Sequence, residues 1–85
     1  MNLEISDNAK KQLKRLPKNI QQKTHKSFSL LLEDYRHPSL RSKKMSGTTY
    51  FEARIDYHYR FTFSIENETI NILHLGSHDE GLGKK

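Results

Sequence analysis

The chain has 85 residues, which is enough for one small domain over residues 1–85 and leaves no room for a second. It contains no cysteine, which excludes both a disulfide framework and a thiolate zinc site. No apolar stretch approaches the roughly 20 residues of a membrane span, and the first residues lack the basic start and apolar core of a signal peptide. We therefore expect a soluble, cytoplasmic protein with no membrane partner.

Positive charge is concentrated in the first half of the chain. Residues 1–47 carry eleven basic and four acidic side chains, whereas residues 48–85 carry four basic and six acidic ones. The formal net charge of the whole chain is +5. Such an excess in a small domain indicates an anionic partner, such as nucleic acid or an acidic protein. A solvated, lysine-rich helix face would produce the same bias.

The first half of the sequence predicts a short strand followed by two helices. Apolar and polar residues alternate over residues 2–6, which is typical of a strand. A short helix follows and ends at Pro17, which lacks an amide donor and disfavours helical geometry in the residue before it. A longer helix is expected over residues 19–35, where apolar side chains recur on one stripe. Two helices joined at a proline make a helical hairpin.

The second half of the sequence changes from a helical period to a period of two. A polar, basic loop is expected over residues 36–47. Strands are expected over residues 50–55, 59–66 and 69–75, and a polar tail follows from residue 76. Helices grouped before an antiparallel sheet give an α+β domain. We predict a two-helix hairpin packed on one face of a small, mostly antiparallel four-stranded sheet, in the order β-α-α-β-β-β.

One face of this predicted sheet is polar. The alternation places the polar side chains of the two middle strands on the face away from the helices, and these are Arg54, Arg60, Thr62 and Ser64. Two arginines on neighbouring strands make this face a candidate docking surface.

Several standard catalytic and metal-binding motifs are absent from the sequence. It has no glycine-rich phosphate loop, no Gly-x-Ser-x-Gly elbow and no His-Glu-x-x-His helix. Metal-ligating residue types do occur late in the chain, but His74 falls in a strand and His78, Asp79 and Glu80 fall in the tail. Their spacing does not favour a metal site. We expect neither a metal nor an organic cofactor.

The remaining candidates are cations beside histidines. Arg54 and Arg60 lie on adjacent predicted strands, Lys43 and Lys44 precede them, and His78 follows the last strand. Metal-free RNA cleavage needs a base for the ribose 2′-hydroxyl, cations for the phosphorane, and an acid for the leaving 5′-oxygen. Histidine suits acid–base work because its ordinary pKa is about 6.5. The alternative is that these side chains are ordinary surface charges.

The sequence resembles the RelE/ParE superfamily of toxins from bacterial type II toxin–antitoxin systems. The matching segments occur in order over nearly the whole chain: AKKQLKRLP (9–17), LEDYRHP (32–38), KMSG (44–47), YFEAR (50–54), YRFTF (59–63) and HLGSHDE (74–80). The resemblance implies a helical hairpin on a small antiparallel sheet. It also implies one of two activities, because RelE-like members cleave messenger RNA on the ribosome whereas ParE-like members poison DNA gyrase.

The resemblance also implies roles for individual residues. Arg54 and Arg60 occupy strand positions where RelE-like toxins place cations that bind phosphate and stabilise the transition state. His78 resembles the C-terminal catalytic histidine of the YafQ branch, so we expect it to act as the general acid. Lys43, Lys44, His58 and His74 are expected to contact RNA, and each remains a possible general base.

Two positions depart from the superfamily pattern. Glu52 stands where such toxins can carry another lysine, and Leu82 falls near the position of a C-terminal aromatic residue. Both departures favour the alternative, a gyrase-inhibiting or catalytically weakened toxin. In either case the implied partners include a cognate antitoxin, acidic and partly disordered until it binds. For the nuclease the partners are also the ribosome and messenger RNA.

Overall fold

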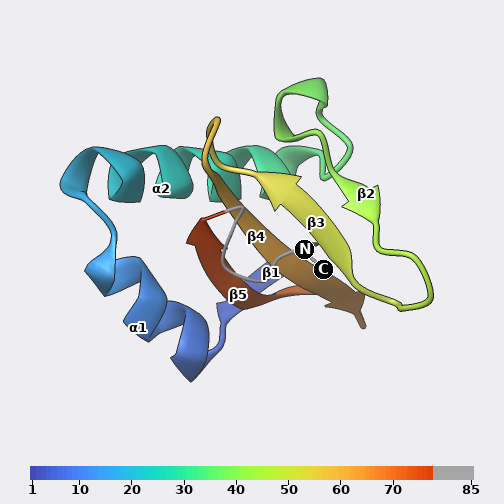
Figure 1. The fold of residues 1–85 in the computed structure, drawn as a ribbon. Helices are drawn as coiled ribbons and strands as arrows, with labels where there is room; N and C mark the ends of the chain where they lie inside the picture. Colours follow the sequence, from blue (N-terminus) through green and yellow to red (C-terminus); the bar gives the residue numbers. More distant parts are fainter. Residues whose placement is uncertain (78–85) are drawn as a thin grey trace.

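Five strands form one sheet in the order β1-β5-β4-β3-β2, with two helices packed against it (Figure 1). The computed structural model describes residues 1–77. The elements are β1 (Asn2–Ile5), α1 (Asp7–Arg15), α2 (Lys18–Glu33), the 3-10 turn η1 (Pro38–Leu40), β2 (Lys43–Lys44), β3 (Phe51–Arg54), β4 (Tyr59–Glu66) and β5 (Thr69–Ser77). Strand β1 runs parallel to β5, and every other neighbouring pair is antiparallel. The predicted α+β class and helical hairpin are confirmed.

The sheet has five strands where the sequence predicted four. The additional strand, β2, lies inside the segment that we expected to be a basic loop, and its two residues pair with Phe51 and Glu52 of β3. A strand of two residues is too short to leave an alternating pattern in the sequence. The last strand is also longer than predicted, because Gly76 and Ser77 continue the ladder with β4 instead of beginning a tail.

The core lies between α2 and the central strands. Phe28 of α2 packs edge-to-face on Phe61 of β4, with ring centroids 5.3 Å apart and planes at 87°. Leu31 and Phe63 are equally well buried beside this pair. Burial of aromatic and branched side chains on this scale is the main stabilising term for so small a domain.

Helix α1 closes the open edge of β5. Strand β1 pairs only with residues 69–72 of β5, so the backbone beyond that point needs other partners. The side chains of Ser6 and Asn8 donate hydrogen bonds to the Leu73 carbonyl, at 3.2 and 3.4 Å, and Gln12 Oε1 accepts one from the Leu75 N–H at 2.7 Å. The helix is thereby fixed at the point where β5 carries an irregularity in its pairing with β4.

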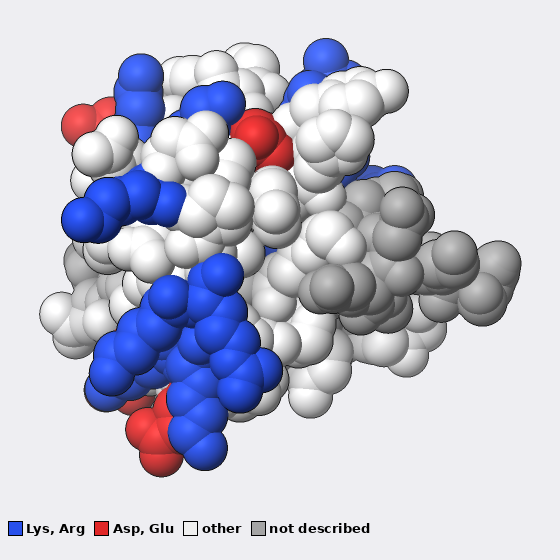
Figure 2. Space-filling model, turned by 60° about the vertical axis from the view of Figure 1, so that its left-hand side comes forward, with Lys and Arg blue, Asp and Glu red and all other residues white. Residues whose placement is uncertain are grey.

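The outer face of α1 is strongly basic. Four exposed side chains of this helix are cationic: Lys10, Lys11, Lys14 and Arg15. Figure 2 shows basic side chains gathered in one continuous patch on the side of the molecule where α1 lies. Among residues 1–77, no helix is long and apolar enough to cross a membrane.

Candidate nucleic-acid interface

The sheet face turned away from the core carries two neighbouring rows of polar side chains. Direct cross-strand partners share a face of a sheet. The row Ala53–Phe61–Leu75 belongs to the core face, since all three side chains are fully buried hydrophobics. The rows on either side of it therefore project from the opposite face. One contains Arg54, Arg60 and Gly76, and the other contains Lys43, Glu52, Thr62 and His74.

A hollow of about 270 Å³ lies at one end of this face. It is lined by four cationic side chains, one carboxylate and one small apolar residue: Arg41, Lys43, Arg54, Arg60, Glu52 and Ala53. Arg41 was not among the residues singled out from the sequence. It follows η1 in the left-handed backbone conformation, with φ 49°, and this turn brings the chain back toward the sheet edge before β2. Only the unpredicted pairing of β2 with β3 brings Arg41 and Lys43 to the arginines.

Arg54 and Arg60 are direct partners across β3 and β4. Like charges at such positions repel one another. The guanidinium of Arg60 turns toward the hairpin between the strands, and its Nη1 donates to the carbonyls of Asp56, Tyr57 and Tyr59 at 2.8, 3.3 and 3.1 Å. The Arg54 side chain makes no hydrogen bond or ion pair within the described residues 1–77.

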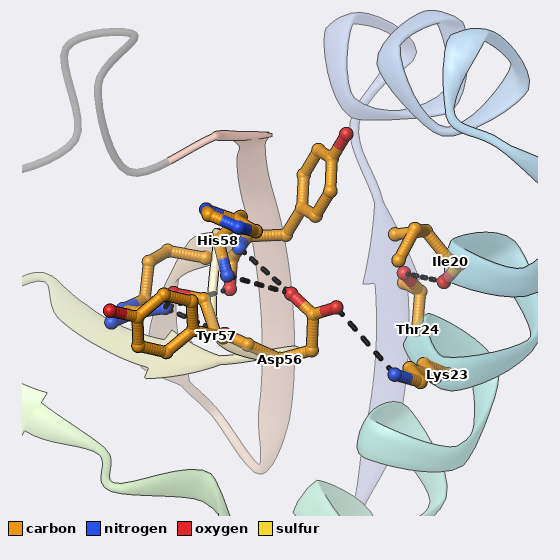
Figure 3. A network of polar contacts seen from close by, with 8 residues as sticks. Ile20, Lys23, Thr24, Asp56, Tyr57 and His58 are labelled. Carbon is orange, nitrogen blue, oxygen red and sulfur yellow. Dashed lines mark hydrogen bonds and ion pairs between the residues drawn. The ribbon is translucent and has the colours of Figure 1, made fainter.

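The hairpin that holds Arg60 is itself anchored by Asp56 (Figure 3). One carboxylate oxygen of Asp56 accepts hydrogen bonds from the His58 and Tyr59 N–H groups, at 2.9 and 3.1 Å. The other lies 3.6 Å from Lys23 Nζ on α2. Partial burial alone would raise the pKa of Asp56, but the two N–H groups and the Lys23 ammonium lower this pKa by more. The net shift is downward, so the anchor stays ionised.

Glu52 places a buried negative charge among these cations. The residue is 7% exposed, and its Oε2 has no hydrogen-bond partner among residues 1–77. A buried carboxylate oxygen without a donor is costly and uncommon. The residue lies in the hollow that contains Arg54 and Arg60, so the charge of the site is lower than its four cations suggest.

His74 is held in one orientation by Gln12. Because Gln12 Oε1 accepts from the Leu75 N–H, its amide Nε2 must be the atom that faces His74 Nδ1, at 3.0 Å. An amide nitrogen can only donate, so His74 Nδ1 accepts and the proton of the neutral ring lies on Nε2. This contact was not predictable from the sequence, because the two residues are 62 positions apart.

The other predicted residues are distributed around this face. Thr62 and Ser64 share it as expected but are buried, since small side chains in a central strand lie between longer neighbours. Lys44 pairs with Phe51, whose row is Phe51–Phe63–Ile72, so it projects from the opposite side of the pleat to Lys43. His58 is exposed at the tip of the β3–β4 hairpin. His78, Asp79, Glu80 and Leu82 lie outside the described residues.

The described part of the chain contains no group of three or more histidine and carboxylate side chains placed to hold a metal ion.

A family model and solved structures match this chain. The model described as "ParE toxin of type II toxin-antitoxin system, parDE" matches residues 3–82. No curated protein matches the sequence. The archaeal RelE–RelB complex from Pyrococcus horikoshii OT3 contains a chain that superposes with a TM-score of 0.79 at 22% identity, covering 94% of this chain and 97% of that one.

Two further solved structures have the same fold. YafQ from E. coli strain BL21(DE3) superposes with a TM-score of 0.78 at 15% identity, covering 96% of this chain and 98% of that chain. The YoeB–YefM complex from Staphylococcus aureus gives a TM-score of 0.70 at 20% identity, with coverage of 92% and 97%. At these identities the likeness establishes the shared fold.

Proposed function

We propose that this chain, which belongs to the ParE toxin family of type II toxin–antitoxin systems, is an endoribonuclease that cleaves messenger RNA on the ribosome and so inhibits translation. The observation that carries the proposal is the direct pairing of Arg54 with Arg60 in a hollow that also contains Arg41 and Lys43. Guanidinium groups that line one hollow can bind phosphate oxygens in a bidentate manner and stabilise the negative charge that develops on them.

The reaction that these residues would support uses the RNA's own 2′-hydroxyl as the nucleophile. A base removes the 2′-hydroxyl proton, O2′ attacks phosphorus, and a phosphorane forms. The bond from phosphorus to the 5′-oxygen then breaks as that oxygen takes a proton from an acid, which leaves a 2′,3′-cyclic phosphate and a 5′-hydroxyl. The protein has to supply a base, an acid and cations around the phosphorane.

The arrangement of the described residues suggests roles for them. Arg54, which has no partner among residues 1–77, would bind the scissile phosphate, and Arg60 would stabilise the phosphorane. His74, with its proton on Nε2, suits a hydrogen-bond donor to phosphate. Lys43 and the carboxylate of Glu52 share the face of the arginines and are the nearest candidates for the base. His78 keeps the proposed role of general acid, on the resemblance to the YafQ branch.

A cognate antitoxin is the second part of the proposal. RelE from Pyrococcus horikoshii was solved in complex with RelB and YoeB from Staphylococcus aureus with YefM, and RelBE2 from Mycobacterium tuberculosis was solved as a toxin–antitoxin complex. We expect this chain to be neutralised by an acidic protein that is partly disordered until it binds. Co-expression with the neighbouring small open reading frame should yield a stable complex and relieve growth arrest. A neighbour that does neither would contradict the toxin assignment.

Mapping messenger RNA ends after incubation with translating ribosomes tests the nuclease. Cuts within the decoding site are expected with the wild-type chain. Arg54→Ala is the cleanest variant, because Arg54 supports no other described residue, and it should weaken ribosome binding and lower its salt dependence. Arg36→Ala, an exposed arginine that stacks on Tyr35 at the end of α2, is the matched control and should cleave normally.

His78→Ala tests the acid. Loss of a general acid costs about 10²–10⁴-fold in rate and leaves binding largely unchanged. The variant should therefore bind antitoxin and ribosomes but cleave poorly. His74→Ala should instead lower thermal stability first, since it removes a partner of Gln12. Full toxicity of His78→Ala would remove this histidine from the mechanism.

A gyrase-inhibiting toxin is the second candidate function. Two observations favour it: the matching family is named for ParE, and Glu52 lowers the positive charge of the hollow. Gyrase-linked DNA breaks without RNA cuts in the same assay would support this candidate over the nuclease.

A further inference from the structure

The basic patch on α1 shares no residue with the hollow that contains Arg54 and Arg60. We define the α1 basic surface as Lys10, Lys11, Lys14, Arg15 and Lys18, all of them exposed. The first four lie on α1, a helix of nine residues and so about 13 Å long, and Lys18 begins α2 directly after the connection. Figure 2 shows basic side chains gathered on this side of the molecule.

The charges of this surface are not balanced within the described chain. The one ion pair of residues 1–77 joins Lys23 to Asp56, and neither residue belongs to the surface. Asp7 is the single acidic residue of α1, and it lies in the first turn. Lysines at i and i+4, such as Lys10 and Lys14, are about 6 Å apart along the axis and repel one another. The clustering therefore costs stability.

Lys18 is a second cation of this surface whose position costs stability. It is the first residue of α2, where the partial positive charge of the helix dipole disfavours a cation. The first turn of α2 contains no acidic residue, and Pro17 provides no side-chain cap. Helix stability would favour Asp or Glu at this position, so the lysine has no explanation within the fold. An anion bound across the end of α1 and the start of α2 would compensate it.

The composition of the surface distinguishes between anionic partners. An antitoxin segment that folds on binding needs apolar anchors to offset its ordering. The exposed residues of α1 are all polar or charged, while Leu13 and Leu16 are partly buried against the core. Single-stranded RNA is held by aromatic side chains on which its bases stack, and α1 contains none. Double-stranded RNA is recognised through its phosphates and its shape, which is what a purely cationic helix can offer.

We propose that the α1 basic surface binds the phosphate backbone of double-stranded RNA, such as a structured segment of ribosomal RNA. It would anchor the protein while the hollow around Arg54 and Arg60 acts on a different, single-stranded segment. This inference rests on the proposed function in taking RNA as the target, but it concerns different residues. The binding would be sequence-independent and strongly dependent on salt.

Fluorescence anisotropy with a labelled RNA hairpin tests the surface without ribosomes. The double variant Lys11→Gln, Lys14→Gln removes two proposed phosphate contacts. Each contact contributes about 0.7–0.9 to the slope of log K against log salt concentration, so the slope should become shallower by about 1.4–1.8. At about 0.1 M salt, this change in slope corresponds to a roughly 25- to 60-fold loss of affinity for the RNA hairpin. Circular dichroism checks that the variant folds.

The matched control variant removes two positive charges that lie outside the α1 basic surface. Lys26→Gln, Arg36→Gln also neutralises two exposed cations, from α2 and the segment after it, and should keep the wild-type slope. Equal losses in the two variants would show a general charge effect and overturn the proposal, as would a loss of antitoxin affinity with unchanged RNA affinity. If the hairpin binds as predicted while wild-type protein cuts no messenger RNA on ribosomes, the surface stands and the nuclease assignment fails.

Discussion

The anchor of the β3–β4 hairpin offers a sharp test of how the site is held in place. Within residues 1–77, Asp56 links the hairpin tip to α2 by polar contacts, through two hydrogen bonds on one oxygen and the Lys23 ion pair on the other. Replacing it by alanine removes all three interactions. Replacing it by asparagine leaves an amide oxygen that can still accept from the His58 and Tyr59 N–H groups but removes the charge.

The cost of each substitution follows from this geometry. Loss of the hydrogen bond from the partly buried Tyr59 N–H lowers the free energy of unfolding by about 1–1.5 kcal/mol. Loss of the bond from the His58 N–H costs less, because this group is exposed and can bind water instead. The Lys23 side chain is 54% exposed, so its pair with Asp56 contributes about 0.5 kcal/mol at most. Asp56→Ala should therefore lower the free energy of unfolding by about 2 kcal/mol and Tm by about 8–16 °C. Asp56→Asn keeps both hydrogen bonds and loses the ion pair, so it should cost about 0.5 kcal/mol.

Urea denaturation and amide hydrogen exchange measure the two effects separately. Exchange at Tyr59 should accelerate in Asp56→Ala and stay near the wild-type rate in Asp56→Asn. Lys23→Gln is the control for the ion pair and should change stability by about 0.5 kcal/mol or less. If Asp56→Asn destabilises the protein as much as Asp56→Ala, the hydrogen bonds to the backbone are not what holds the hairpin.

The same carboxylate predicts a pH dependence with a definite sign. Its pKa is lowered in the folded state, so its contribution to stability is complete above the unfolded pKa of about 3.9 and is lost as pH falls through the lower folded pKa. The stability difference between wild type and Asp56→Asn should be constant above about pH 5 and shrink below about pH 4. The other carboxylates are common to both proteins and cancel. A difference that persists unchanged to acid pH would contradict the assigned shift.

Two further predictions concern Gln12 and Glu52. Gln12→Ala should leave the Leu75 N–H without its acceptor and lower the free energy of unfolding, measured in urea, by about 1–3 kcal/mol. It should also allow the neutral His74 ring to exchange tautomers in nitrogen NMR spectra, and a ring unchanged by the substitution would disprove the orientation assigned to it. Glu52→Gln removes a negative charge from the cationic hollow and should strengthen RNA binding by about 1 kcal/mol, roughly fivefold, as measured by anisotropy; weaker binding would mean that Glu52 itself contacts the ligand.

The parts of the fold that follow from local periodicity were predictable from the sequence. Strand β4 was expected over residues 59–66, and the structure has it over the same residues, because a strand with one apolar and one polar face has strictly alternating side chains. The start of α2 was also close to prediction, since Pro17 permits few alternatives. Such features are determined by neighbours in the chain.

The features that complete the candidate site depend on register and were not predictable. The direct pairing of Arg54 with Arg60 follows from the hairpin length, but the arrival of Arg41 and Lys43 depends on a two-residue strand without a sequence pattern. The contact of Gln12 with His74 depends on how α1 meets the edge of β5. Composition and periodicity cannot specify contacts between residues so far apart in the chain.

The two faces of the sheet have different roles, because one forms the core and the other carries charged side chains that the fold does not need. The core face supplies the stabilising contacts, with Phe28, Phe61 and Phe63 buried against one another. On the other face, within the described chain, the Arg54 side chain has no polar partner and the Glu52 side chain has an unpartnered oxygen, so neither side chain holds the strands together. Substitutions there change the charge of the hollow at little cost to the fold, and a neutral, acidic or basic residue at position 52 would each suit a different ligand. We therefore expect the charge balance among Glu52, Arg54 and Arg60, rather than the scaffold, to decide which ligand this face of the sheet binds.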